Sequence, residues 1–263
     1  MNVKLGICVG FSALTLHAAT NVWDGGSATD NNWSSVENWN PDGAPVSASD
    51  THLQFIGLVR VDPYQNIATP FVLNRLDFLG GATNTTTFTI RGSQLQFVTN
   101  GTTSPRIHLS RNASCVITNA IDIPAGTTLI ADIGTYSVDF RGPITGDGSI
   151  DKNDYSGGLS FNNSSSTFSG GLIVRAKNDD WGKVNINASY AMGTGPISLY
   201  GGTMVTNKTN PGGLSFYNTT VHTNPIALFA HSPIFAAMPN GNNGNVTLNG
   251  SLDLNTYTLH LRG

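Results

Sequence analysis

The stretch that decides the fold runs from Gly157 to Val174 and reads GGLSFNNSSSTFSGGLIV. It contains two pairs of glycines, and each pair is followed by a short run with apolar residues two positions apart, LSF after the first pair and LIV after the second. Alternation with a period of two is typical of a strand that buries one face. Paired glycines supply the backbone freedom, including positive φ, that a tight corner needs. The stretch therefore predicts two short strands, each opened by a glycine corner.

The same unit recurs along the chain, which predicts a repeat architecture. The block GGLSF appears again at Gly212–Phe216, and a third kind of copy, GGTMV, begins at Gly201. The glycines that we interpret as repeat corners are Gly157, Gly158, Gly170, Gly171, Gly201 and Gly202.

Between these copies lie further short runs with strand-like alternation, and none has the i, i+3, i+4, i+7 spacing of a helix. We therefore expect an all-β protein with almost no helix beyond the first 19 residues. The runs are 75–79, 87–90, 94–98, 107–109, 137–140, 184–186, 197–200 and 246–248.

Many short strands fit a sandwich, a barrel or a solenoid. Asp147-Gly148 and Asn249-Gly250 are dipeptides typical of hairpin turns, which favour antiparallel pairs and keep a sandwich open. Against a sandwich, the runs are brief, the glycine corners recur, and Asn and Thr occupy positions where stacked side chains would form ladders. A solenoid accounts for all three observations.

Three spaced motifs carry a family resemblance. They are ITGDGSIDK at 144–152, the stretch quoted above, and AMGTGPISLYGGT at 191–203. Together they resemble the autotransporter-associated β-strand repeat of bacterial passenger proteins. The resemblance implies a right-handed parallel β-helix, secretion, and a passenger or cell-surface role.

The chain divides into three parts. Residues 1–19 combine Lys4, an apolar core and the small pair Ala18-Ala19, which is the pattern of a secretory signal peptide. Residues 20–60 form a Trp-rich cap segment, and residues 61–263 form the β-helix repeats. The chain ends directly after a strand-like run, so we expect a poorly capped last turn of a truncated repeat array, with end-to-end self-association.

Trp23, Trp33 and Trp39 are the first candidate site. They either cover the open end of the coil or form a stacking platform for sugar rings. A row of Tyr136, Tyr155, Trp181 and Tyr200 is a second candidate for carbohydrate contact, although the spacing does not place these residues on one face.

Composition disfavours several classes of function. The 13 basic and 16 acidic residues give a net charge of −3, which offers no footprint for nucleic acid. The six His residues are dispersed, and no spacing typical of zinc, nucleotide or cofactor binding occurs. Asp147, Asp151, Asp154, Asp179 and Asp180 are interpreted as turn residues rather than calcium ligands or catalytic acids. Cys115, in an apolar run, is expected to be buried.

We therefore expect a secreted or surface-exposed, non-catalytic structural or adhesive module whose partners are glycan or extracellular matrix. The alternatives are a polysaccharide-binding module and a β-helical polysaccharide lyase or glycosidase. An enzyme of that kind gathers basic and acidic side chains from adjacent turns, and we expect Arg91, Arg106, Arg111 and Arg175 not to converge.

Overall fold

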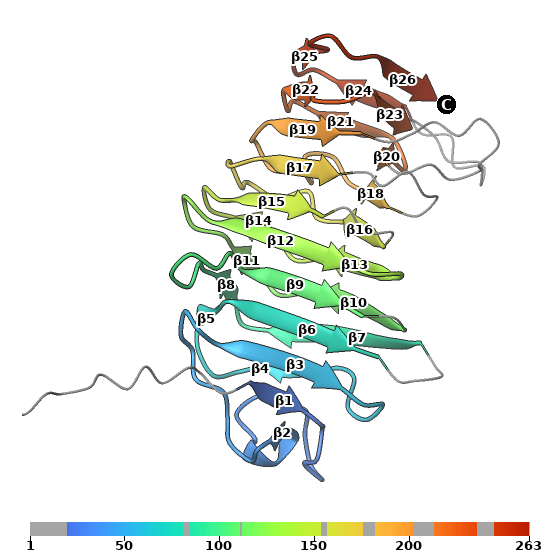
Figure 1. Cartoon of the computed structure of the whole chain (residues 1–263). Helices are drawn as coiled ribbons and strands as arrows, with labels where there is room; N and C mark the ends of the chain where they lie inside the picture. The colour runs from blue at the N-terminus through green and yellow to red at the C-terminus, as the bar shows by residue number, and fades with distance from the viewer. Residues whose placement is uncertain are drawn as a thin grey trace, which may run out of the picture.

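The chain is a β-solenoid, seen in a computed structural model that describes residues 20–80, 85–110, 112–153, 157–175, 182–201, 213–235 and 245–262 (Figure 1). Within these ranges the single helical element is a 3-10 turn, η1 (Val36–Asn38). None of the described residues form a helix with the length and apolarity needed to cross a bilayer. The predicted signal peptide, residues 1–19, lies outside the described residues.

The chain climbs from one turn to the next around three walls. In Figure 1 it runs from left to right along the front sheet, returns behind and rises towards the C-terminus, so the coil is right-handed. The front wall, sheet 1, has eleven strands, in the spatial order β2 (Trp39–Asn40), β1 (Asn21–Trp23), β3 (His52–Ile56), β6 (Arg75–Leu79), β9 (Arg106–Leu109), β12 (Thr128–Ile133), β15 (Ser149–Lys152), β17 (Leu172–Arg175), β19 (Ile197–Tyr200), β22 (Ile226–Leu228) and β25 (Leu252–Asp253).

The other three sheets have fewer strands. Sheet 2 contains β26 (Leu259–Arg262), β23 (Ser232–Phe235), β20 (Gly213–Phe216), β18 (Lys183–Ile186), β16 (Gly158–Phe161), β13 (Ser137–Phe140), β10 (Ala113–Ile117), β7 (Thr86–Gly92) and β4 (Tyr64–Gln65). Sheet 3 contains β14 (Ile144–Thr145), β11 (Ile121–Asp122), β8 (Leu95–Phe97) and β5 (Phe71–Leu73), and sheet 4 pairs β21 (Thr220–His222) with β24 (Val246–Leu248).

Pairing between described strands is parallel, with β1–β2 as the exception. The two hairpin-type dipeptides are corners instead, because each joins strands of different sheets. Asp147-Gly148 leads from β14 to β15, and Asn249-Gly250 leads from β24 to β25. The sandwich alternative is therefore wrong, and the parallel β-helix prediction is confirmed. Parallel pairing already begins between β1 and β3, inside the segment 20–60.

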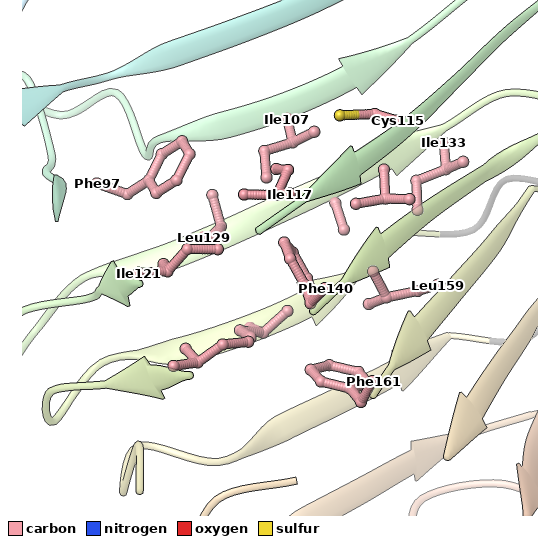
Figure 2. Packing of buried hydrophobic residues seen from close by; sticks show 14 of the residues in the cluster. Phe97, Ile107, Cys115, Ile117, Ile121, Leu129, Ile133, Phe140, Leu159 and Phe161 are labelled. Carbon is pink, nitrogen blue, oxygen red and sulfur yellow. The ribbon is translucent and has the colours of Figure 1, made fainter. Parts of the chain in front are cut away.

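The interior is filled by the inward side chains of successive turns, which stack on one another (Figure 2). Phe140 of β13 lies opposite Phe161 of β16, with ring centroids 5.6 Å apart. Phe55 stacks on Phe78 at 5.1 Å in the same way. Cys115 is buried in this core, as expected, and burial raises the pKa of its thiol well above the ordinary value. In-register stacking gives each turn the apolar surface that it cannot bury alone.

The predicted corner glycines act in two ways. Gly171 has φ +96°, and Gly201 also has positive φ, as predicted. Gly157, Gly158 and Gly170 do not, so for them the prediction of positive φ is wrong. At Gly170 the reason is close packing, since a Cβ there would lie 2.4 Å from the carbonyl carbon of Gly148 in the turn below.

Gly157 serves the same purpose, because its Cβ would lie 2.7 Å from the carbonyl oxygen of Ile133. Gly202 lies outside the described residues.

Candidate functional site

The three predicted tryptophans lie together at the first turn of the coil. The ring centroids of Trp23 and Trp39 are 5.1 Å apart and those of Trp33 and Trp39 5.9 Å apart, both edge to face. Phe55 and Phe71 pack against them from the next turns, and the Trp33–Phe71 centroid distance is 5.2 Å. All three indoles have 0% exposure. This arrangement covers the apolar end of the coil and leaves no indole face for a sugar ring.

Hydrogen bonds fix two of the indoles in place. Trp39 Nε1 donates to the carbonyl oxygen of Trp33 at 2.8 Å, and Trp23 Nε1 donates to that of Arg60 at 3.1 Å. Trp33 Nε1 is buried and has no acceptor among the described residues. The cluster is therefore held by edge-to-face ring contacts together with two hydrogen bonds from indole N–H groups.

A second group of side chains, which the sequence did not predict, lies on the outer face of sheet 1. It spans four adjacent strands, β3, β6, β9 and β12. Every member carries an ionisable side chain, and we call the group the charged face. It consists of His52, Arg75, Asp77, Arg106, His108 and Asp132.

Its first half is built around Asp77, whose side chain is 3% exposed. Arg75 Nε donates to Asp77 Oδ1 at 2.7 Å, and His52 Nε2 lies 2.8 Å from Asp77 Oδ2. Burial pushes the pKa of Asp77 up, but the hydrogen bonds from His52 and Arg75 outweigh it and the pKa ends lower than usual. Asp77 is thus a carboxylate at neutral pH.

His52 also joins the first two strands of the parallel ladder. Its Nδ1 lies 3.0 Å from Thr20 Oγ1. Thr20 Oγ1, the His52 ring and the Asp77 carboxylate thus form a continuous hydrogen-bonded chain.

The second half repeats the pattern without a hydroxyl. Arg106 Nη1 donates to Asp132 Oδ2 at 2.8 Å, and His108 Nδ1 lies 3.2 Å from the same oxygen. The Asp132 side chain is 6% exposed, whereas that of Arg106 is 38% exposed. Arg75 and Arg106 lie directly opposite each other in the ladder. Arg75 and Arg106 thus start from facing positions, and each guanidinium binds its own buried carboxylate, Asp77 in β6 and Asp132 in β12.

The arginines named from the sequence fall in separate places. Arg91 is in β7 of sheet 2 and pairs with Asp62, while Arg175 is in β17 and contacts Asp151 through both carboxylate oxygens. Arg111 lies outside the described residues. Arg91, Arg106 and Arg175 do not meet, as expected. However, Arg106 binds Asp132 of β12 and lies opposite Arg75 of β6 in the ladder, so basic and acidic residues of adjacent strands do gather on this face.

An aromatic ladder continues the same face of sheet 1 towards the C-terminus. The rings of Tyr200 and Phe229 are nearly parallel, with centroids 4.7 Å apart, and the Arg175 guanidinium carbon lies 4.8 Å from the Tyr200 centroid. Arg175 is in β17 and Phe229 directly follows β22, and since these strands lie on either side of β19, the two side chains cover both faces of Tyr200. Tyr136 lies in the corner after β12, and Tyr155 and Trp181 lie outside the described residues. Of the candidate row, the structure therefore describes Tyr136 and Tyr200, and these two lie at different points of the coil.

The remaining acids serve corners and ladders. Asp147 Oδ1 accepts from Ser169 Oγ at 2.6 Å, and Asp151 holds Arg175. Asp154, Asp179 and Asp180 lie outside the described residues. Among the residues that the structure describes, no group of three or more His, Cys, Asp or Glu is placed to hold a metal ion.

Comparison with known proteins gave no match to this chain, whether with family models, with curated proteins or with solved structures. The resemblance to the autotransporter-associated repeat therefore depends on the three motifs at 144–152, 157–174 and 191–203.

Proposed function

We propose that the chain is an exported bacterial repeat module of the autotransporter-passenger type, with a structural or adhesive role at the cell surface and no catalytic activity. The observation that carries the proposal is the uninterrupted parallel register of sheet 1 from β3 to β22. Such a register makes an elongated rod whose outer surface can be displayed. The apolar leader at 1–19 supports export.

The polar ladders on the outer surface support a structural role. Asn187 Nδ2 donates to Asn162 Oδ1 at 2.8 Å one turn below, and Asn218 Nδ2 donates to the carbonyl oxygen of Asn187 at 3.2 Å. Stacked amides of this kind tie successive turns together without charge. At the far end Leu248, Leu252, Leu254 and Leu261 are exposed, and we propose that they also support end-to-end self-association.

Export is tested by producing the complete chain, and a variant lacking residues 2–19, in a Gram-negative host. We expect the complete chain outside the cytoplasm, with a mature N-terminus at Thr20, and the shortened variant inside the cell. N-terminal sequencing and cell fractionation are the measurements. An unprocessed chain that stays in the cytoplasm would contradict the proposal.

The enzymatic alternative, a polysaccharide lyase or glycosidase, is favoured by one observation, the convergence of Asp77, Asp132 and their His and Arg partners on one face. Against it, the lowered pKa of Asp77 is the opposite of what a general acid needs. We expect the purified chain to release no reducing ends from acidic or neutral polysaccharides. Turnover that disappears in Asp132→Asn but not in Asp62→Asn would replace the proposal with the alternative.

A further inference from the structure

The arginines on the outer face of sheet 1 share a layered arrangement. Arg75 is 41% exposed above Asp77 at 3%, and Arg106 is 38% exposed above Asp132 at 6%. The carboxylates lie beneath and the guanidinium groups lie outside, so the layer that meets solvent is cationic although the charges balance. Arg175 repeats this order above Asp151, at 38% against 17%. The Arg91–Asp62 pair of sheet 2 lacks it, because both of its members are exposed.

Arg75 and Arg106 are also an unusual pair. They lie directly opposite each other on adjacent parallel strands, which are about 4.8 Å apart, and like charges in that position oppose each other. Each guanidinium gives one hydrogen bond to its own aspartate, Arg75 through Nε and Arg106 through Nη1. The N–H groups that remain have no protein acceptor among the described residues. Each guanidinium is held by its own aspartate and keeps N–H donors that suit an anionic group of a ligand, so the two arginines can bind separate groups of one polymer.

We infer that Arg75 and Arg106 form a binding site for the carboxylate or sulfate groups of an anionic polysaccharide. This inference rests on the proposed surface role, which places such polymers within reach of the chain. Arg175 lies on the same face three strands beyond Arg106, about 14 Å at the spacing of a parallel sheet, so a polymer with repeated charges reaches both points. Nucleic acid fits poorly, because a chain with 13 basic and 16 acidic residues lacks the many cations that a phosphate backbone needs.

The site is tested with purified protein at low salt against four polymers: polygalacturonate, dextran sulfate, neutral dextran and polyglutamate. We expect binding to polygalacturonate, to dextran sulfate or to both, and none to dextran. Arg75→Gln and Arg106→Gln should each weaken that binding about tenfold or more, because each removes charge-assisted hydrogen bonds. Binding to only one of the two anionic glycans identifies the group that is bound.

The matched control is Arg91→Gln, which removes an arginine with an aspartate partner from sheet 2. It should bind like the unchanged chain. If the Gln variants unfold, the double variant Arg75→Lys with Arg106→Lys keeps both charges above the buried carboxylates and removes only the forked geometry, and it should still lose affinity.

Absence of binding to both anionic glycans, equal binding to polyglutamate, or an equal loss in Arg91→Gln would each overturn the site. The binding assay does not depend on export. A chain that binds the glycans but is not exported would therefore support the site and contradict the proposed cell-surface role.

Discussion

Trp39→Ala should lower the free energy of unfolding by about 3–5 kcal/mol, the usual cost of removing a buried large aromatic side chain. Trp39 is fully buried, contacts Trp23 and Trp33 edge to face, and donates its N–H to the Trp33 carbonyl. The loss is expected in chemical unfolding monitored by circular dichroism. In a solenoid each turn is stabilised by its neighbours, so amide hydrogen exchange should rise first in β1 and β3.

Two variants make this result specific to a cap. Trp39→Phe keeps most of the apolar volume and should cost clearly less than the Ala variant. Val46→Ala changes a side chain that is 73% exposed and should leave the free energy of unfolding within about 0.5 kcal/mol of the original. An unchanged midpoint for Trp39→Ala, combined with loss of retention on a glycan column, would instead make the tryptophans a ligand platform.

Much of the architecture is predictable from local sequence. The eight alternating runs named from the sequence each coincide with or overlap one described strand; 197–200, for example, is β19 and 137–140 is β13. Alternation identifies these strands because their inward side chains are apolar. The hairpin signals failed as evidence for a sandwich, since Asp and Asn followed by Gly satisfy the backbone of a solenoid corner as well as that of a hairpin.

The charged face was not predictable, because it depends on which residues lie one turn apart. The turns vary in length: Thr128 contacts Ser149, 21 residues later, whereas the contact between Asn187 and Asn218 spans 31 residues. Without a constant repeat length, nothing in the sequence aligns Arg75 with Arg106. The dispersed histidines gave no sign that two of them bind buried aspartates, His52 at Asp77 and His108 at Asp132.

The interior near the C-terminal end differs from the rest in the same unpredictable way. Inward positions of β21 carry Thr220 and His222 where most other turns carry aliphatic or Phe side chains. Thr220 Oγ1 and both ring nitrogens of His222 are buried with no partner in the described part of the chain. Buried polar groups without partners reduce stability, so this turn is expected to be weaker than the apolar turns before it.

Acid should therefore destabilise the chain through His222. Its ring is 1% exposed and packs on Phe216 with centroids 5.0 Å apart, and burial lowers its pKa from 6.5 to about 4. The folded chain keeps this imidazole neutral, while the unfolded chain takes up a proton below about pH 6.5. Stability is then lost as the pH falls from about 6.5 to about 4, by about 3 kcal/mol in total at 1.36 kcal/mol for each pKa unit.

His222→Phe isolates this contribution, because it keeps a ring of similar size and removes the titrating group. The free energies of unfolding of the two proteins, measured by denaturant titration at several pH values, should differ more at pH 4.5 than at pH 7.5. Below about pH 4 the difference should level off. Aspartates with lowered pKa values, such as Asp77 and Asp30, lose their contribution only in that lower range, and they do so equally in both proteins.

The place of the first opening is also expected. β24 pairs with β21 through His222 and Leu248, and Leu248 is 36% exposed, so displacing β24 is the shortest way to hydrate a protonated His222. At pH 4.5 amide exchange in 246–248 should therefore rise in the unchanged chain and not in His222→Phe. Parallel pH curves for the two proteins would show that His222 is already hydrated in the native coil. Acid-induced exchange that begins in β1 and β3 would show that the chain does not open first at β24.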